Sequence, residues 1–384
     1  MACMKLSDQK YCFVVTCFSE NQPGFLDFSY RIKSLATQYR LTVVSSFPLT
    51  QTELQFPNVN YIVIQASPGR LGWLSYLWAC ATLIRHQQPD VAVLLHSMAA
   101  PVALLVGRVP TVTYWNEHPT HVAPVPETAA PIKGMTRRLV RWLMFHGARK
   151  SNLVMPIGEA HRDDLLAHGC QQERTRMIYM GVEQSFAGVA LSEVPRSDAA
   201  TLQLVYVGSV HQDRGRDVML EAIKIANQDQ EIAHLTIVGA SAEQLEYCKN
   251  AIQTLNVAEF VTVLGRVPGH SIPNFMKSAD AGLCLWEDLP WYRFNPPTKL
   301  FEYLVAGLPV LASNIRTHTQ YVHDGRNGLI FEYGRNGLAD AIKRLWFAKD
   351  ELPQMKRQTR DESVAYLWQS IEDDFLDAVE GVAR

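Results

Sequence analysis

The chain has 384 residues, 47% of them hydrophobic, and a formal net charge of −2 from 36 basic and 38 acidic side chains. This composition excludes a disordered chain and suits one large or two ordinary globular domains. The lack of a basic surplus argues against a nucleic-acid-binding protein.

The first predicted element is a strand rather than a leader peptide. Only the eight residues 11–18 (YCFVVTCF) form an apolar run there, which is short for a signal-peptide core. Of the longest uncharged stretches, 71–84 is too short to span a membrane, and 91–107 contains polar residues and a proline that divide it. We therefore predict a cytoplasmic protein without a transmembrane segment. Its seven cysteines include no Cys-x-x-Cys pair and are predicted to be reduced core residues.

Short apolar or β-branched runs alternate with helical patterns along the whole chain. Fully apolar runs such as VAVLL and LTIVG are typical of parallel strands buried on both faces. This alternation predicts a doubly wound α/β architecture. The predicted strands are 12–17, 41–45, 61–65, 91–95, 110–115, 152–156, 176–179, 203–208, 234–238, 260–264, 281–285 and 309–312.

A polar, proline-containing segment at 191–203 lies near the middle of the chain. About a dozen strands would be unusual for one sheet, so we predict two Rossmann-like domains facing across a cleft. The first covers 1–190 and the second 200–361, and a C-terminal helix at about 362–384 crosses back onto the first. Ligands of such proteins bind at the carboxyl ends of the strands.

The strongest local signal is NPPTKLFEYLVAGLPVLASN, residues 295–314. Two prolines predict a helix that begins near Pro297–Thr298, and Gly307 followed by Pro309 predicts its end. A helix start carries partial positive charge and unpaired N–H groups, so it attracts anions.

Three side chains of this helix suit a phosphorylated sugar ligand. Thr298 and Lys299 add a hydroxyl and an ammonium group at the helix start. Glu302, one turn later on the same face, is better placed to accept hydrogen bonds from sugar hydroxyls than to meet phosphate. On this pattern alone, an ordinary capped helix with surface Lys and Glu remains an alternative.

The stretch PTKLFEYLVAGLPVLASN resembles the signature helix of the retaining family 4 (group 1) glycosyltransferases, which have the GT-B fold. Other segments resemble further family elements in the expected order, whereas the first 150 residues match only loosely. These segments are 151–186, 205–223, 260–268, 278–285 and 324–332.

The resemblance implies roles for individual residues. Glu302 would bind the donor ribose, Arg214 the diphosphate, and Arg266 with Val267 would border the base. The predicted nucleotide-sugar-binding set is Gly24, Gly208, Ser209, Arg214, Arg266, Val267, Phe294, Thr298, Lys299, Leu300 and Glu302. The catalytic set is His118, Glu117, Arg214 and Lys299.

Two positions depart from the family pattern. Phe294 stands where the family often has a first glutamate, and Ser209 stands where an arginine often follows Gly208. We interpret the missing carboxylate as altered donor choice rather than lost activity.

The chemistry expected is metal-independent transfer. Cations and a helix dipole aimed at the departing diphosphate stabilise its developing charge. The chain has no Asp-x-Asp element for a metal, so we expect no metal and no cofactor besides the nucleoside-diphosphate sugar co-substrate. The resemblance implies retention of configuration. Glu287 and Asp288 are adjacent on a loop and do not form a hydrolase-type pair.

In the N-terminal half, TVTYWNEHP (111–119) is a strand that runs into two candidate residues. Family members often have a histidine here that contacts the donor sugar, so His118 is the first candidate, with Glu117 second as acceptor base. The loop QPGF at 22–25 resembles one that approaches the diphosphate, which places Gly24 there. An exposed loop histidine is the alternative reading of His118.

Two other features have open readings. The aromatic residues before the signature helix suit sugar stacking and core packing equally well. This aromatic cluster consists of Trp286, Trp291, Tyr292 and Phe294. Residues 132–150 combine basic and apolar side chains at helical spacing, which suits contact with an anionic membrane and a lipid-linked acceptor. The alternative for 132–150 is a helix that packs on its own sheet and has a solvated basic face. Residues 69–86, which contain two tryptophans, could add to such a membrane surface.

The leading hypothesis is a glycosyltransferase that acts on a glycan, glycolipid or other hydroxyl acceptor. The alternatives are a sugar-nucleotide epimerase of the same architecture and a non-catalytic sugar-nucleotide-binding scaffold, the latter motivated by Phe294 and Ser209.

Overall fold

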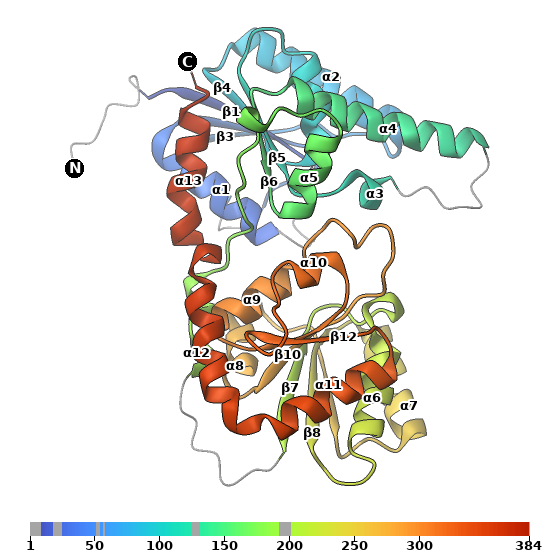
Figure 1. Cartoon of the computed structure of the whole chain (residues 1–384). Coiled ribbons are helices and arrows are strands. Elements are labelled where there is room, and N and C mark those ends of the chain that lie inside the picture. Colours follow the sequence, from blue (N-terminus) through green and yellow to red (C-terminus); the bar gives the residue numbers. More distant parts are fainter. Residues whose placement is uncertain are drawn as a thin grey trace. The chain divides into compact units, whose positions relative to one another are not determined.

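The computed structural model describes residues 9–17, 25–50, 54–56, 58–123, 131–191 and 201–383 (Figure 1). The chain forms two compact units: residues 1–181 with 368–384, and residues 182–367. Within the described residues, no helix is long and apolar enough to cross a membrane. None of the six cysteines described is in a disulfide.

The first unit is built on a parallel sheet with strand order β3-β2-β1-β4-β5-β6. Its strands are β1 (Tyr11–Thr16), β2 (Arg40–Ser45), β3 (Val59–Val63), β4 (Val91–Leu94), β5 (Thr111–Trp115) and β6 (Leu153–Pro156). Its helices are α1 (Phe25–Gln38), α2 (Arg70–Gln87), η3 (Ser97–Leu104), α3 (Pro119–Val122), α4 (Pro131–Lys150), α5 (Glu159–Ala167) and α13 (Trp368–Glu380).

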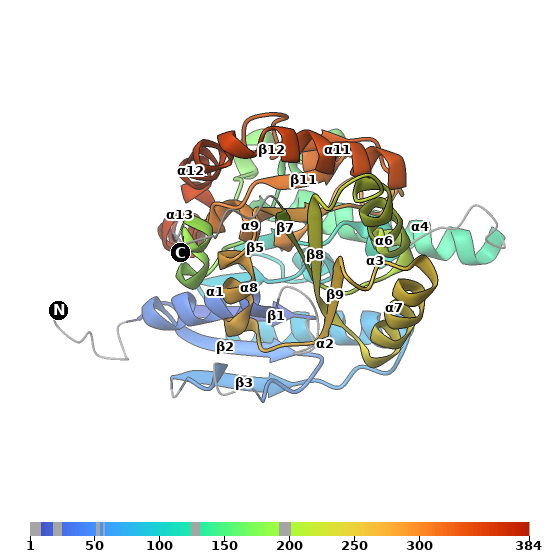
Figure 2. The ribbon, with the colours of Figure 1, turned by 90° about the horizontal axis from the view of Figure 1, so that it is seen from below.

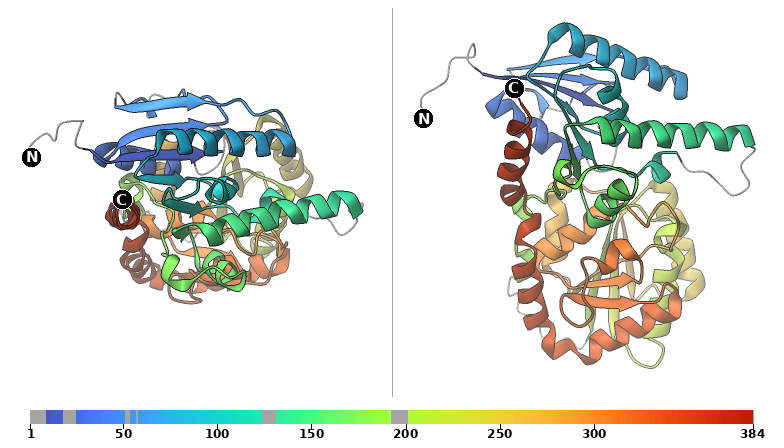
Figure 3. Two further views of the ribbon diagram at one scale, coloured as in Figure 1. Left: turned by 90° about the horizontal axis from the view of Figure 1, so that it is seen from above. Right: turned by 45° about the horizontal axis from the view of Figure 1, so that its top comes forward.

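Helices cover both faces of this sheet (Figure 3). Helices α1 and α13 pack together on one face, and α2 and α4 pack with η3 on the other. Gly147 allows α4 to approach η3 closely, because a Cβ there would lie 2.3 Å from the carbonyl oxygen of Ala100. The apolar strands are therefore buried on both sides, as their composition predicts.

The second unit repeats this topology, with strand order β12-β11-β10-β7-β8-β9, again all parallel. Its strands are β7 (Leu202–Val207), β8 (Ala233–Ala240), β9 (Val261–Gly265), β10 (Ala281–Cys284), β11 (Val310–Ser313) and β12 (Gly328–Phe331). Its helices are η5 (Gln184–Phe186), η6 (Val189–Leu191), η7 (Gln212–Arg214), α6 (Arg216–Ala226), α7 (Ala242–Leu255), α8 (Ile272–Lys277), α9 (Thr298–Ala306), α10 (Arg316–Thr319), α11 (Arg335–Phe347) and α12 (Leu352–Glu362).

Helix α9 is held tightly on this sheet. Figure 2 shows α6, α7 and α11 over one face and α8 and α9 over the other. A Cβ on Gly282 of β10 would lie 2.5 Å from the ring of Tyr303, so only glycine allows this approach. The hydroxyl of Tyr303 then accepts a hydrogen bond of 2.8 Å from the backbone N–H of Val207. Strand β7 and α9 are thereby fixed against each other.

The predicted doubly wound α/β fold is confirmed, and in each unit the strand order is that of a dinucleotide-binding fold. One predicted strand is wrong: residues 176–179 form no strand. An isolated bridge joins Val154 and Thr175 just before this range, and within the range Arg176 and Ile178 each donate one backbone hydrogen bond to β6.

The units divide earlier than the predicted boundary at 190–200. The chain leaves the first unit after Gly181 because the next residues bond to the second: Val182 donates to the carbonyl of Tyr366, and Gly188 donates to that of Val305. Helix α12 also belongs to the second unit, so the chain returns at Trp368 and not at about 362. Residues 192–200 lie outside the described residues.

Candidate functional site

A buried amine lies at the carboxyl edge of the second sheet. Lys299, in the first turn of α9, is only 7% exposed, and its Nζ lies 3.5 Å from the ring centroid of Tyr206 at the end of β7. In the described part of the chain this Nζ has no hydrogen-bond partner. Burial lowers the pKa of Lys299 to about 7. A desolvated cation without an acceptor is costly unless an anion joins it.

The backbone beside Lys299 carries no side chain. Gly208 follows β7 with φ +125°, a conformation that side chains rarely adopt, and a Cβ there would lie 3.6 Å from Nζ of Lys299. Helix α9 begins at Thr298 after the N-cap Pro297, which provides no side-chain cap. Thr298 is exposed, whereas the side chain of Leu300 is buried, and its N–H bonds to the carbonyl of Pro297. The side chain of Leu300 is therefore not exposed to a ligand, and its predicted place in the site stays a prediction.

Arg214 provides a second cation near Lys299, and its charge contributes to the lowered pKa of that lysine. It ends η7, and its Nη1 donates to Oγ of Ser209 at 2.8 Å. Its Nε is buried and has no partner among the described residues. Gly215 makes the turn possible: its φ is +78°, and a Cβ would lie 2.4 Å from Leu285.

Glu302 lies one turn beyond Lys299 on α9. Burial raises the pKa of its carboxyl to about 7, and the nearby lysine opposes this rise. Because Glu302 keeps part of its surface in solvent, water weakens the effect of burial, so its carboxylate is readily available near neutral pH. A cation at the helix start and a carboxylate behind it match the phosphate and sugar ends of one ligand.

The other predicted residues of this unit are more peripheral. Arg266 is exposed and Val267 partly exposed just after β9, at the same carboxyl edge but two strands away from β7. Phe294 is partly buried in the loop between β10 and α9. Gly24, predicted to approach the diphosphate from the first unit, lies outside the described residues.

In the first unit, His118 is buried rather than exposed. It caps α3: Nδ1 accepts a hydrogen bond of 3.2 Å from the N–H of Thr120. Because a backbone amide can only donate, the other ring nitrogen carries the proton and donates to Oδ2 of Asp164 at 2.8 Å. Burial lowers the pKa of His118 despite this partner.

This geometry gives His118 a structural role and leaves neither ring nitrogen available to a sugar. Its predicted sugar contact therefore gains no support here. Glu117 forms an ion pair with His121, which is half exposed. Burial acts to raise the pKa of Glu117, but the hydrogen bond from His121 and the charges of His121, His96 and His161 together outweigh it, so the net pKa falls. A carboxylate with a lowered pKa is a weaker base, which argues against Glu117 as acceptor base.

The sequence did not single out Tyr206, Asp213 or Tyr292 as site residues. The ring of Tyr206 lies beneath Nζ of Lys299. Because Tyr206 is part of an apolar strand, the sequence alone indicates an ordinary core residue. Tyr292 donates to Oδ2 of Asp213 at 2.7 Å, next to Arg214. The aromatic cluster before α9 was visible in the sequence, but which of its rings carries a polar contact was not.

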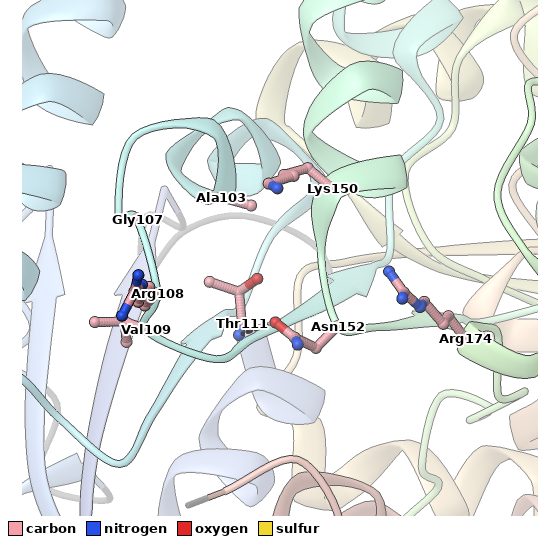
Figure 4. Close-up of a pocket in the computed structure, with 8 residues that line it drawn as sticks. All are labelled: Ala103, Gly107, Arg108, Val109, Thr111, Lys150, Asn152 and Arg174. Atoms are coloured by element: carbon pink, nitrogen blue, oxygen red, sulfur yellow. Dashed lines mark hydrogen bonds between the residues drawn. The ribbon is translucent and has the colours of Figure 1, made fainter.

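A separate cavity of about 320 Å³ lies in the first unit (Figure 4). It is at the amino ends of β5 and β6, whereas ligands of doubly wound sheets bind at the carboxyl ends. Its lining is basic, without an acidic side chain, and consists of Ala103, Gly107, Arg108, Val109, Thr111, Lys150, Asn152 and Arg174.

Comparison with known families agrees with the geometry. A family model described as glycosyl transferases group 1 matches residues 201–347, and one described as a glycosyl transferase 4-like domain matches 32–181. The chain belongs to the group 1 glycosyltransferases. Lys299, Arg214 and Glu302 all lie within the first match.

Individual relatives of this glycosyltransferase are distant. The chain is 25% identical over 170 residues to the amylovoran biosynthesis glycosyltransferase AmsK of Erwinia amylovora, and 22% identical over 188 residues to spore coat protein SA of Bacillus subtilis. These matches cover 43% and 46% of this chain, and 40% and 48% of the relatives, so the chain matches only about half the length of either.

Solved structures share the fold of this glycosyltransferase along nearly its whole length. HepE (Alr3699) of Anabaena, solved with UDP-glucose, is 16% identical with a TM-score of 0.73, over 97% of this chain and 100% of that one. WaaG, a glycosyltransferase involved in lipopolysaccharide biosynthesis, is 16% identical with a TM-score of 0.71, over 96% and 100%. The fold is therefore GT-B.

Proposed function

We propose that this protein transfers a sugar from a nucleoside-diphosphate sugar to a hydroxyl group of a glycan or lipid-linked acceptor. The observation that carries the proposal is Lys299: a buried ammonium without a hydrogen-bond acceptor among the described residues, next to a glycine that places no side chain against it. The donor class also agrees with the UDP-glucose of the HepE structure.

In the proposed reaction, the bond between the anomeric carbon and the diphosphate oxygen breaks and negative charge grows on the diphosphate. Lys299, Arg214 and the start of α9 stabilise that charge, a contribution that preorganised donors make most strongly in a desolvated site. Glu302 holds the ribose. The acceptor hydroxyl attacks from the face that the leaving group vacates, so the configuration is retained, and its proton passes to the departing diphosphate.

We also propose that no metal ion takes part. The two cations can do the work that a divalent ion does in other phosphate sites. Transfer rates that are equal with and without EDTA would support this route, and a loss restored by Mg²⁺ or Mn²⁺ would contradict it.

The central experiment offers the protein UDP-, GDP- and dTDP-sugars with hydroxyl acceptors and measures nucleotide release. Lys299→Ala and Glu302→Ala are expected to lose activity by at least about 100-fold, a size typical of losing a charge-stabilising group. Lys249→Ala, which removes an exposed lysine of α7, is the matched control and should act like wild type. Wild-type rates in Lys299→Ala would remove it from the site.

The same assay separates the other functions. Interconversion of donor sugars without transfer would identify an epimerase. Thermal stabilisation by nucleotide without turnover of any donor would identify a binding scaffold.

We further propose that the first unit contacts an anionic membrane surface, which suits a lipid-linked acceptor at the inner face of a membrane. Helices α2 and α4 both pack on η3, and Arg70 of α2 donates a hydrogen bond to Thr136 of α4. Together they hold eight of the 36 basic and none of the 38 acidic side chains. Each helix also has a stripe of exposed apolar residues at helical spacing, namely Leu71, Leu74 and Trp78, and Met135, Leu139 and Trp142.

Basic charge beside exposed tryptophans is the composition of an interfacial helix. We expect the protein to sediment with vesicles of phosphatidylcholine and phosphatidylglycerol and not with phosphatidylcholine alone. Trp78→Ser with Trp142→Ser should abolish this binding, whereas Phe347→Ser, at an exposed aromatic of α11, should not. Equal binding by the double variant would refute the surface.

A further inference from the structure

The loop between β10 and α9 is fastened at Tyr292. The ring of Tyr292 stacks on Trp286 with centroids 4.4 Å apart, and both pack with Ile315. The carbonyl of Tyr292 accepts a hydrogen bond of 2.8 Å from Oγ1 of the fully buried Thr317. Ring and backbone are thus fixed independently, so the hydroxyl group is held at a defined place.

That hydroxyl group holds the short helix that carries Arg214. It donates to Oδ2 of Asp213 at 2.7 Å, and Asp213 precedes Arg214 in η7. Arg214 itself donates through Nη1 to Oγ of Ser209 at 2.8 Å. The guanidinium is therefore bonded directly to Ser209, and Tyr292 fixes the turn from which its side chain extends.

We propose that Tyr292 and Ser209 are positioning residues that hold the guanidinium of Arg214 in place for the diphosphate. This rests on the proposed function. It also explains Ser209, because the chain has a hydroxyl group that orients Arg214 at the position where the family resemblance leads one to expect another arginine.

The physical reason is preorganisation. An unrestrained arginine loses rotamer entropy when it binds a ligand. A guanidinium already aimed at the developing charge avoids this cost and reorganises less during reaction. Nε of Arg214 is buried and has no partner among the described residues, so its N–H group is left for a ligand.

The test uses variants that remove one oxygen each. Tyr292→Phe keeps the ring stack and Ser209→Ala keeps the backbone, so both should retain the wild-type melting temperature within about 2 °C. Each is expected to lower kcat by about 10-fold with little change in KM, because the loss falls mainly on the transition state. Ser209→Thr, which keeps the hydroxyl group, should stay within about 3-fold of wild type.

A mutant cycle with Arg214→Ala distinguishes positioning from a merely structural role. If Tyr292 acts through Arg214, then Tyr292→Phe should cause no further loss once Arg214 is alanine. Tyr247→Phe, at an exposed tyrosine that stacks under Arg216, is the matched control.

Two failures remain distinguishable. An active wild type with Tyr292→Phe at full rate, or with additive losses in the cycle, overturns this inference alone. A wild type that transfers sugar from none of the donors overturns the proposed function, and the inference falls with it.

Discussion

Replacing Lys299 with methionine should stabilise the protein while it destroys the function. Methionine keeps the length and the apolar stem of the lysine but not its charge. In the folded protein burial lowers the pKa of Lys299 from 10.5 to about 7. At about 1.4 kcal/mol for each pKa unit, the buried amine costs at most about 4 kcal/mol of folding free energy at pH 7. Because the lost contact with Tyr206 offsets part of this, we expect a gain of about 1–3 kcal/mol.

The pH dependence identifies the cause. The penalty is absent above the unfolded pKa of 10.5, grows as the pH falls, and is complete below about 7. The advantage of Lys299→Met over wild type should therefore shrink by about 2 kcal/mol between pH 7 and pH 9.

Urea unfolding followed by tryptophan fluorescence at both pH values measures this difference. Lys249→Met, at an exposed lysine of α7, should change the free energy of unfolding by less than about 0.5 kcal/mol at either pH. A Lys299→Met variant less stable than wild type at pH 7, or an advantage that does not change with pH, would refute the reasoning.

Three further predictions concern the same fold. A bound diphosphate favours the charged form of Lys299, so above pH 7 nucleotide binding should take up a proton. The affinity for the nucleotide should then fall by up to about tenfold per pH unit. Calorimetry in buffers of different ionisation enthalpy measures the proton uptake. Arg31→Met should cost about 3–5 kcal/mol in urea unfolding, because it leaves Asp27 buried without its ion-pair partner; a loss below about 1 kcal/mol would contradict this. Gly147→Ala should lower the melting temperature, because its Cβ would lie 2.3 Å from the carbonyl oxygen of Ala100, and an unchanged melting curve would show that α4 can shift freely.

Local signals let the sequence predict α9 almost to the residue. Its predicted start near Pro297–Thr298 and its end at Gly307 are confirmed, and Gly307 has the left-handed conformation expected of a C-cap. Proline and glycine restrict or extend their own backbone torsions, so their effect can be predicted without knowing the rest of the fold. The alternation of apolar strands with helices predicted the doubly wound architecture, because hydrophobic periodicity is also a local signal.

The burial and hydrogen-bond partners of a side chain could not be predicted in this way. His118 has the pattern of a loop residue, yet Asp164, 46 positions further along the chain, joins it in a buried hydrogen bond. The boundary between the units likewise depends on the hydrogen-bond partners of the backbone after Gly181, which lie in the second unit. These outcomes depend on contacts between distant segments, about which local sequence carries no information.

Sequence patterns predicted the limits of the signature helix and, apart from the false strand at 176–179, the order of strands and helices, since both follow from residues acting on their immediate neighbours. The folded structure determines that Lys299 is desolvated above Tyr206, that Arg214 is bonded to Ser209, and that both ring nitrogens of His118 are engaged. Packing brings remote groups together and removes water from around them, and charge and basicity follow from that environment.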